Sequence, residues 1–333
     1  MTQAFFFRTI LQGMFPVCFM GLSITAWAQA SDPAAILQRI ANAARNLSYS
    51  GVFVHSTQDS STATRITHVS DRGGEWEKIE PLDGPPSEII RRNEEMYCYH
   101  PQSKTVRLER RLTGRFFPSL LTAAPQAILD NYQLKTGATE RIGGYDCQWV
   151  FLEPRDTLRY LQALCADVST GLLVRAATLN ERNQVLEQFT FTQLNFGKDA
   201  VRDFGRVRNK LSFGAKPGER QTDSPVQRDM KNAETGWMVA NPPAGFNKVM
   251  EMKRTMAGRT DQVSHLVFSD GVVSVSIFIA PLSGGIKGSS NAVEDGMVSY
   301  AMRPVDGHQA TALGEVPLGA AQLLVNGVSL KSH

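Results

Sequence analysis

The feature of this sequence that most constrains its fold is a long series of short segments with alternating or β-branched residues. Between Tyr49 and Phe196 these segments follow one another closely, and Gly, Pro, Asn or Ser residues separate most of them. Short strands at such spacing predict an antiparallel meander. The expected strands are Tyr49–Gln58, Thr62–Ser70, Gly74–Leu82, Ser87–Arg92, Glu95–His100, Thr105–Arg111, Tyr132–Thr139, Cys147–Glu153, Leu158–Asp167, Leu172–Asn180 and Gln184–Phe196.

Helices are expected at two places beside this meander. Asp32 can cap a helix over Ala34–Arg45, and Pro33 fits its first turn. The apolar residues of that helix follow one stripe, which suits packing on a sheet. The apolar segment Phe116–Leu121 is not strand-like, and a short helix is expected after it, over Ala124–Asn131. Together these elements predict an α+β architecture.

Apolar residues become sparse over residues 197–233. This stretch contains nine Lys and Arg residues and five Asp and Glu residues. This composition predicts a basic linker between two domains. Such a stretch is usually exposed to solvent and has no binding role. The alternative is a docking strip for an acidic partner or an anionic lipid headgroup. The candidate partner-binding residues on it are Arg202, Arg206, Arg208 and Lys210.

A second unit is expected over residues 234–333, because strand and turn signals resume there. Asp270 and Gly271 stand between the apolar runs His265–Phe268 and Val272–Ala280, which is a strong hairpin signal. These elements fit a small α+β domain. Its other expected elements are strands over Lys248–Thr255, Asn291–Ala301 and His308–Gly314, and a helix or strand over Leu318–Gly327.

The first residues are typical of a secretory signal peptide. Arg8 supplies the positive charge, and a mostly apolar stretch follows as far as Trp27. Ala26 and Ala28 place small residues at the two positions that signal peptidase recognises. We therefore expect cleavage after Ala28 and an exported, soluble mature protein. The alternative is an uncleaved membrane anchor.

Composition and motifs argue against several classes of function. Of the 333 residues, 42% are hydrophobic and 20% are charged, which is ordinary for a globular protein. The net charge of +3 is too small to indicate a nucleic-acid-binding protein. The sequence contains no Gly-x-Ser-x-Gly elbow and no nucleotide-binding glycine motif, and its six histidines lack zinc-ligand spacing. We expect no enzyme activity, no cofactor and no metal.

Export makes a disulfide bond possible, and the mature chain has three cysteines, Cys98, Cys147 and Cys165. If residues 155–157 form a three-residue hairpin loop, Cys147 faces Cys165 directly at a distance that suits a disulfide. A loop one residue shorter or longer places the two cysteines on opposite faces. They would then be reduced, buried side chains, and the sequence leaves both outcomes open.

A set of aromatic and apolar residues in the first unit has two interpretations. The first is an ordinary core. The second is an incompletely filled half-barrel that takes an acyl chain, with Phe116–Leu121 as its lid. Each buried CH₂ group contributes about 0.8 kcal/mol to such binding before ordering costs. The candidate lipid-pocket residues are Trp76, Phe116, Phe117, Leu120, Leu121, Trp149, Phe151, Phe189 and Phe191.

Several short motifs, spread over both units, carry a resemblance to a known family. None of them is catalytic, so the specificity lies in their joint occurrence and order. Through them the chain resembles the RseB/MucB family of periplasmic negative regulators of the envelope stress sigma factor, sigma-E. The motifs are Tyr49–Val54, Leu152–Asp156 followed by Arg159 and Tyr160, Thr170–Leu173, Leu186–Phe189, Pro243–Phe246, His265–Gly271 and Val305–His308.

The resemblance implies an organisation for the whole chain. A signal peptide (1–28) would precede a half-open antiparallel β-barrel with covering helices (29–196), similar to the lipoprotein carriers LolA and LolB. A basic linker (197–233) and a smaller C-terminal α+β domain that binds an anti-sigma factor (234–333) would follow.

The resemblance also implies a function. Family members bind the periplasmic domain of a membrane anti-sigma factor and shield it from regulated proteolysis. They release it on sensing acyl chains of lipopolysaccharide (lipid A) or of lipoproteins. The alternative is a periplasmic lipoprotein or lipid carrier. The resemblance leaves undecided whether the protein forms a homo-oligomer. The family motifs do not identify the residues that contact the partner.

Overall fold

The structure is a computed structural model that describes residues 32–72, 74–93, 95–100, 105–110, 116–198, 200, 202, 220–221, 231–232, 234–256, 259–282 and 288–331. The chain divides into two units, Met1–Ser31 and Asp32–His333, and all described residues belong to the second. The expected signal peptide therefore lies outside the described residues. Within them, no helix is both long enough and apolar enough to cross a bilayer.

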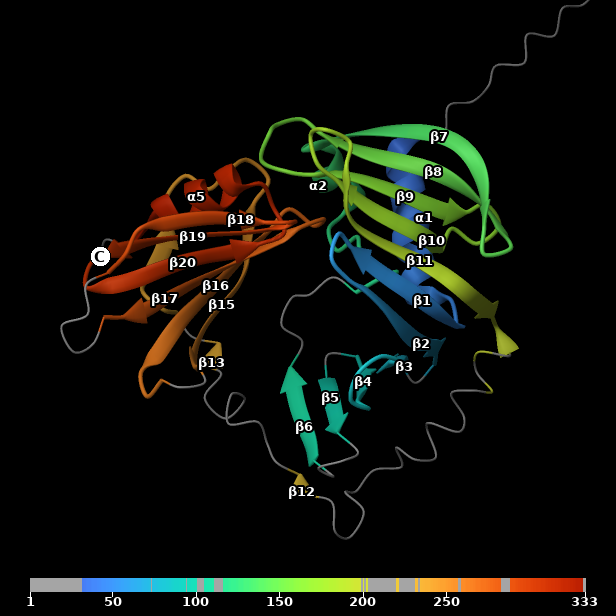
Figure 1. Ribbon diagram of the computed structural model, residues 1–333, viewed down its shortest axis with the longest axis horizontal. Coiled ribbons are helices and arrows are strands. Elements are labelled where there is room, and N and C mark those ends of the chain that lie inside the picture. Colours follow the sequence, from blue (N-terminus) through green and yellow to red (C-terminus); the bar gives the residue numbers. More distant parts are fainter. Residues whose placement is uncertain are drawn as a thin grey trace, which may run out of the picture. The chain divides into compact units, whose positions relative to one another are not determined.

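The N-terminal part of the second unit forms a 12-stranded sheet in which almost all neighbouring strands are antiparallel (Figure 1). The expected meander is confirmed as two runs, β1 to β6 and β7 to β11, which are joined where β1 pairs with β11. The strands are β1 (Tyr49–Thr57), β2 (Ser61–Asp71), β3 (Gly74–Pro81), β4 (Glu88–Arg92), β5 (Glu95–His100), β6 (Thr105–Arg110), β7 (Tyr132–Ile142), β8 (Tyr145–Pro154), β9 (Leu161–Asp167), β10 (Leu173–Leu179), β11 (Val185–Phe196) and β12 (Arg220–Gln221).

Two helices accompany this sheet, as the sequence predicts. Helix α1 (Pro33–Asn46) begins at Asp32, whose carboxylate accepts a hydrogen bond from the backbone N–H of Ala34 at 3.1 Å. Its buried residues belong to the same core as the inner face of the sheet, and α1 runs across β8 to β11 in Figure 1. Helix α2 (Pro125–Leu129) is shorter than expected. The main core of this part thus lies between α1 and the sheet.

The C-terminal part forms a 7-stranded sheet, a pair of short strands and one helix. The 7-stranded sheet has the order β13-β15-β16-β17-β20-β19-β18, and helix α5 packs on β19 and β20. The strand order of both large sheets is linear, so neither closes into a barrel among the described residues. The elements are β13 (Lys231–Asn232), β14 (Trp237–Val239), β15 (Asn247–Thr255), β16 (Gln262–Ser269), β17 (Ser274–Pro281), β18 (Asn291–Asp295), β19 (Val298–Val305), β20 (His308–Gly314), α5 (Leu318–Asn326) and β21 (Val328–Leu330).

One expected strand in this part is wrong. Residues 291–301 form two strands, β18 and the start of β19, because Asp295 and Gly296 turn the chain between them. Gly296 has φ +59°, a conformation that favours glycine. The same Asp-Gly signal correctly predicts the turns at Gly271 and Gly307.

Cys147 and Cys165 form a disulfide, but the expected register is wrong. Cys147 pairs with Asp167, and Trp149 pairs with Cys165, so the two cysteines are diagonal neighbours with their Cα atoms 5.4 Å apart. The connection between β8 and β9 covers residues 155–160 instead of three residues. Because the ladder is shifted by an even number of residues, the cysteines stay on one face and the bond can form.

We expect that replacing both Cys147 and Cys165 by Ala lowers the free energy of unfolding by about 3 kcal/mol, because the unfolded chain regains the entropy of a short closed loop. Urea unfolding of the mature protein measures this loss. Cys98→Ala is the matched control, since Cys98 takes no part in this disulfide. A double variant that unfolds at the same urea concentration as the control would contradict the expected stabilisation.

A charged cluster ties together β2, β3 and β4. Arg91 donates hydrogen bonds to Glu75 at 2.6 Å and to Glu77 at 2.8 Å, and His68 Nε2 lies 3.1 Å from Glu75. Partial burial disfavours the ionised form of Glu75. The hydrogen bonds from His68 and Arg91 outweigh that effect and hold the pKa of Glu75 at about 2.

This low pKa predicts a loss of stability in acid. Glu75 stabilises the fold fully above its ordinary pKa of 4.5, and the contribution disappears as the pH falls toward 2. Because solvent partly reaches the carboxylate and screens it, we expect a loss of about 1–2 kcal/mol. The urea midpoint of the natural protein, measured between pH 5 and pH 2.5, should fall more steeply than that of Glu75→Gln. Parallel curves for the two proteins would refute this assignment.

Candidate functional site

A buried ion pair joins the 12-stranded sheet to the 7-stranded sheet. Arg159 lies in the connection between β8 and β9, and Asp270 lies in the turn between β16 and β17. The guanidinium Nε donates to Asp270 Oδ2 at 2.6 Å, and neither side chain is exposed to solvent. Burying two charges is costly unless both are fully hydrogen-bonded. The surroundings of each charge therefore decide whether this contact is stable.

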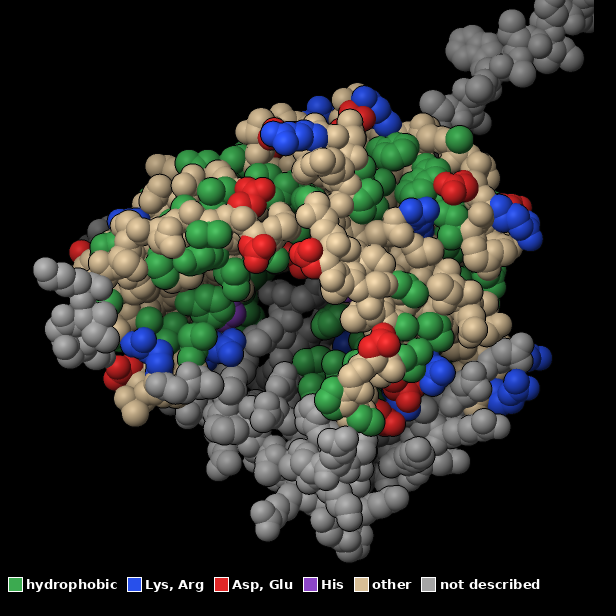
Figure 2. All heavy atoms as spheres, in the orientation of Figure 1, with side chains coloured by type: hydrophobic (Ala, Val, Ile, Leu, Met, Phe, Trp, Pro, Cys, Tyr) green, Lys and Arg blue, Asp and Glu red, His purple; other side chains and the backbone are tan. Residues whose placement is uncertain are grey.

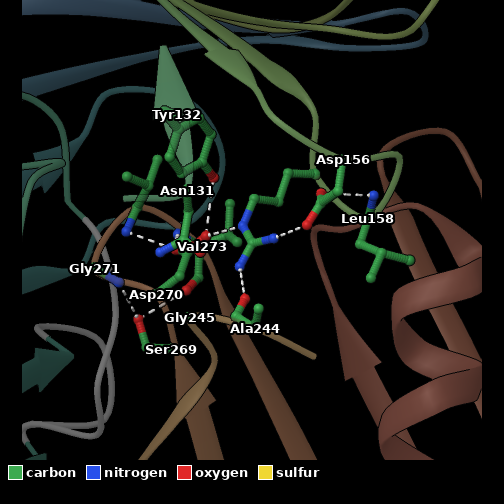
Figure 3. A network of polar contacts seen from close by, with 12 residues as sticks. Asn131, Tyr132, Asp156, Leu158, Ala244, Gly245, Ser269, Asp270, Gly271 and Val273 are labelled. Carbon is green, nitrogen blue, oxygen red and sulfur yellow. Dashed lines mark hydrogen bonds and ion pairs between the residues drawn. The ribbon is translucent and has the colours of Figure 1, made fainter. Parts of the chain in front are cut away.

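Both carboxylate oxygens of Asp270 accept hydrogen bonds (Figure 3). The Tyr132 hydroxyl donates to Oδ2 at 3.0 Å. The backbone N–H groups of Val272 and Val273 donate to Oδ1 at 2.9 and 2.8 Å. Asp270 thus shapes its own hairpin turn with one oxygen and holds the opposite sheet with the other.

The guanidinium of Arg159 is equally well satisfied. It donates to the carboxylate of Asp156 and to the backbone carbonyl of Ala244, in addition to Asp270. Its central carbon also lies 4.6 Å from the ring centre of Phe246. A planar guanidinium with several fixed donors can make these contacts at once, which a lysine cannot.

Two glycines allow the backbones to approach at this centre. Gly271 has φ +90°, and a Cβ there would collide with the Cβ of Ala123. Gly245 has φ +83°, and a Cβ there would collide with the side chain of Asn131. The carbonyl of Gly271 also accepts a hydrogen bond from the backbone N–H of Thr122 at 2.9 Å. Only glycine fits either position.

A second contact begins at the neighbouring residue, Tyr160. Its hydroxyl donates to Glu294 at 3.2 Å, and its ring packs with Leu186 and Met297 in a small apolar cluster. Burial and the charge of Glu294 raise the pKa of Tyr160 above its ordinary value. Met297 belongs to the turn between β18 and β19, which the sequence analysis did not predict. This turn therefore supplies Met297 to the apolar contact with Tyr160 and Leu186.

These contacts explain why β9 begins late. Arg159 and Tyr160 both point to the second sheet, so neither pairs with β8, and the ladder starts at residue 161 or 162. Both residues belong to a motif that carries the family resemblance, as do Gly245, Asp270 and Gly271. The motifs marked these residues as significant, but the pairing of Arg159 with Asp270 was not predicted. The signal that the sequence offered was a basic residue in one family motif and an acidic residue in another.

Part of the predicted lipid-pocket set does come together on the inner face of the 12-stranded sheet. The ring of Phe117 stacks on that of Phe189, with the two ring centres 5.4 Å apart. The centre of the Phe191 ring lies 5.0 Å from that of Phe117. Phe117, Leu120 and Leu121 are 3%, 6% and 3% exposed and belong to the main core. The Phe116–Leu121 segment thus fills the floor of the predicted trough with its own side chains.

The other predicted aromatic residues lie elsewhere. Across strands β8 to β11, the paired residues that lie beside one another include Val150 on β8 and Phe189 on β11. Trp149 is the strand neighbour of Val150 and lies one position away from this line of paired residues. Neighbouring residues of a strand point to opposite faces, so Trp149 and Phe151 lie on the face away from Phe189. They stack on each other at 6.0 Å. Trp76 lies under the guanidinium of Arg92 instead. The expectation that all nine residues line one face is therefore wrong.

A cavity of about 420 Å³ lies beside the filled trough. The 12-stranded sheet and the Phe116–Leu121 segment contribute Phe116, Leu120 and Phe189 to its lining. The 7-stranded sheet contributes Ser276 and Leu313, among others. The cavity is thus built by residues from both sheets, and its shape depends on the contacts between them.

The predicted basic docking strip is only partly described. Arg202 is exposed, whereas Arg206, Arg208 and Lys210 lie outside the described residues. The role of this stretch stays a prediction.

Comparison with protein families matches both parts of the chain. Residues 32–211 match the model described as MucB/RseB N-terminal domain, and residues 231–329 match MucB/RseB C-terminal domain. Sigma factor AlgU regulatory protein MucB of Pseudomonas aeruginosa is 31% identical over 300 residues, covering 88% of this chain and 90% of the relative. Sigma-E factor regulatory protein RseB of Haemophilus influenzae is 22% identical, covering 93% of this chain and 95% of the relative.

Solved structures give a consistent result. The complex of Pseudomonas aeruginosa MucA and MucB contains a chain that is 26% identical to this one, with a TM-score of 0.69. A crystal structure of MucB in complex with MucA(peri) is 27% identical, again with a TM-score of 0.69. Each alignment covers 91% of this chain and 100% of the solved chain.

We expect Asp270→Ala to lower the free energy of unfolding by about 3–5 kcal/mol, because it removes the buried carboxylate that accepts from Arg159, Tyr132 and the N–H groups of its own turn. The matched control is Asp146→Ala, which breaks an exposed ion pair with Arg141 and should cost less than about 1 kcal/mol. Urea unfolding of both variants checks the difference. Equal effects would mean that the buried pair does not stabilise the contact between the sheets.

Proposed function

This chain belongs to the MucB/RseB family, and from that membership we propose that it binds the periplasmic part of a membrane anti-sigma factor and shields it from regulated proteolysis. The bound factor is released when the protein senses acyl chains of lipid A or of lipoproteins. The protein thereby acts as a negative regulator of the sigma factor.

The observation that carries this proposal is the similarity to MucB structures solved with MucA. The match extends over 91% of this chain, at 26–27% identity, so it includes both sheets and not the N-terminal part alone. The curated relatives are described as sigma factor regulatory proteins.

The proposed organisation follows the sequence boundaries. The protein is periplasmic after cleavage behind Ala28. Residues 29–196 form a half-open, LolA/LolB-like barrel, residues 197–233 a basic linker, and residues 234–333 the anti-sigma-binding domain. The linear strand order and the helix across the inner face of the sheet support a half-open form. Arg202, Arg206, Arg208 and Lys210 would attract acidic segments of the partner.

Lipid sensing would use the Phe116–Leu121 segment. Phe117 and Leu121 already fill the trough, so an acyl chain must displace this segment to reach the apolar floor. The displacement would also move Phe116 and Leu120, which line the cavity between the sheets. Lipid binding and partner binding would then oppose each other, and such couplings are typically about 1–3 kcal/mol.

A lipoprotein or lipid carrier is the second candidate, because it could use the same N-terminal trough. The buried pair of Arg159 and Asp270 favours the regulator. A carrier has no need of a second sheet that is fixed to the first through buried charges, whereas coupling between two ligands requires a firm connection between their sites.

A protection assay tests the proposal. Adding the mature protein to the periplasmic domain of the cognate anti-sigma factor should slow its cleavage by the initiating protease, and lipid A should restore cleavage. Phe117→Leu should reduce the lipid concentration needed about fivefold, because it loosens the segment by about 1 kcal/mol. Phe151→Leu, on the opposite face, is the control.

Unchanged cleavage in the presence of the protein would refute the regulatory function. Binding to lipidated proteins alone, without binding to the anti-sigma domain, would support the carrier. Equal lipid responses of the two Phe variants would remove the Phe116–Leu121 segment from the sensing mechanism.

A further inference from the structure

Among the residues that the structure describes, three buried nitrogen atoms on one face of the 7-stranded sheet have no hydrogen-bond partner. They are both ring nitrogens of His265, on β16, and Nε of Arg254, on β15. His265 is only 3% exposed. A buried polar group is nearly always hydrogen-bonded, because otherwise it loses its contact with water without compensation. The cluster therefore points to a ligand that supplies the missing partner.

Strand register places these atoms close together, on the face of the sheet away from helix α5. Through β17, Leu266 is aligned with Ala312, a fully buried residue of β20, on which α5 packs. His265 is the strand neighbour of Leu266, so its side chain points to the opposite face. Arg254 pairs with Val263, two positions from His265, which makes Arg254 and His265 diagonal neighbours across the two strands.

The two side chains offer donors to a negatively charged group. Burial and, to a smaller extent, the charge of Arg254 lower the pKa of His265 to about 4, so the ring is neutral at pH 7. One nitrogen of a neutral imidazole carries a hydrogen, and Nε of a guanidinium always does. Figure 2 shows basic and hydrophobic side chains around a histidine over β15 to β17. An anion that accepts from both residues would complete their hydrogen bonds.

The surroundings of these donors are apolar. The ring of Phe278 stacks on that of His265, with the two ring centres 4.3 Å apart, and Met252, which pairs with His265, is 3% exposed. Phe278 is itself only half-buried, so part of its ring can pack against a ligand. A phosphate monoester carries up to two charges at pH 7 and loses more hydration here than a carboxylate, which carries one. The site therefore favours a carboxylate that is attached to an apolar body.

We propose that Arg254 and His265 bind the carboxylate of a small organic acid with an apolar body. One carboxylate oxygen accepts from Arg254 Nε, and the other accepts from the ring of His265. The apolar body packs against Phe278. Because the site lies within one sheet, the inference is independent of the proposed function. It adds a soluble ligand that is distinct from both the acyl chains and the protein partner.

The unpartnered ring has a measurable consequence in the protein without ligand. His265→Phe keeps a ring of similar size and removes both nitrogens from the interior. The variant should therefore melt about 2–4 °C higher than the natural protein. The same variant should lose the ligand, so its stability and its affinity change in opposite directions. A merely structural histidine would not give this combination.

Binding is measured by ¹⁹F NMR with 4-fluorobenzoate as the probe and the mature full-length protein. The natural protein should bind the probe saturably at one site, with a dissociation constant of about 1 mM or lower. Arg254→Met and His265→Phe should each weaken binding at least about tenfold. Lys253→Met is the matched control, because Lys253 carries the same charge on the opposite face of β15 and should leave the affinity unchanged.

Competition with the bound probe identifies the chemical class of the ligand. Benzoate should displace the probe, whereas acetate, which lacks the apolar body, should require at least about tenfold more. Inorganic phosphate that competes as well as benzoate would overturn the preference for a carboxylate. Displacement by phosphatidylglycerol vesicles would assign the site to a lipid headgroup instead. Displacement by the purified anti-sigma domain would assign it to an acidic side chain of that partner.

The variants decide whether the site exists. Equal affinities of Arg254→Met and Lys253→Met, or the absence of saturable binding to the natural protein, would overturn the inference. Normal probe binding by His265→Phe would do so as well. Thermal melts confirm that each variant is folded, and Arg254→Met carries the test if His265→Phe is not. None of these results alters the protection assay, so the proposed function is tested separately.

Discussion

The contact between Arg159 and Asp270 is the interaction on which the rest of this structure depends. Two charges that are removed from water are stable only when every donor and acceptor finds a partner. Here the partners come from both sheets: Tyr132 and Asp156 from the first, and the carbonyl of Ala244 from the second. The ion pair therefore requires one particular arrangement of the two sheets, which an apolar contact alone would specify less strictly.

The consequences reach both ligands of the proposed mechanism. The cavity has walls from both sheets, so it exists only where this contact holds them. The apolar trough next to it is filled by Phe117 and Leu121, and the same segment supplies Phe116 to the cavity wall. A segment with one side in the core and one side in the cavity can transmit the arrival of a lipid to a bound protein. This arrangement fits a regulator better than a carrier.

Strand-level features were largely predictable because they follow from local patterns. The helix capped by Asp32, the meander and the turn at Gly271 all agree with the structure. The candidate lipid set was less accurate, because hydrophobicity does not reveal which face of a strand a residue occupies. Trp149 and Phe189 look alike in the sequence, yet the register of four strands places them on opposite faces.

The sequence by itself determined most of the strands and turns, the family, and the residues that its motifs mark as special, since these depend on side-chain type and short spacing. Only the tertiary structure decided the register of β8 and β9, the filling of the trough and the pairing of Arg159 with Asp270. Those two residues are separated by 111 positions. No local pattern encodes such a contact, because it forms only when both sheets have folded and their charges must be satisfied together.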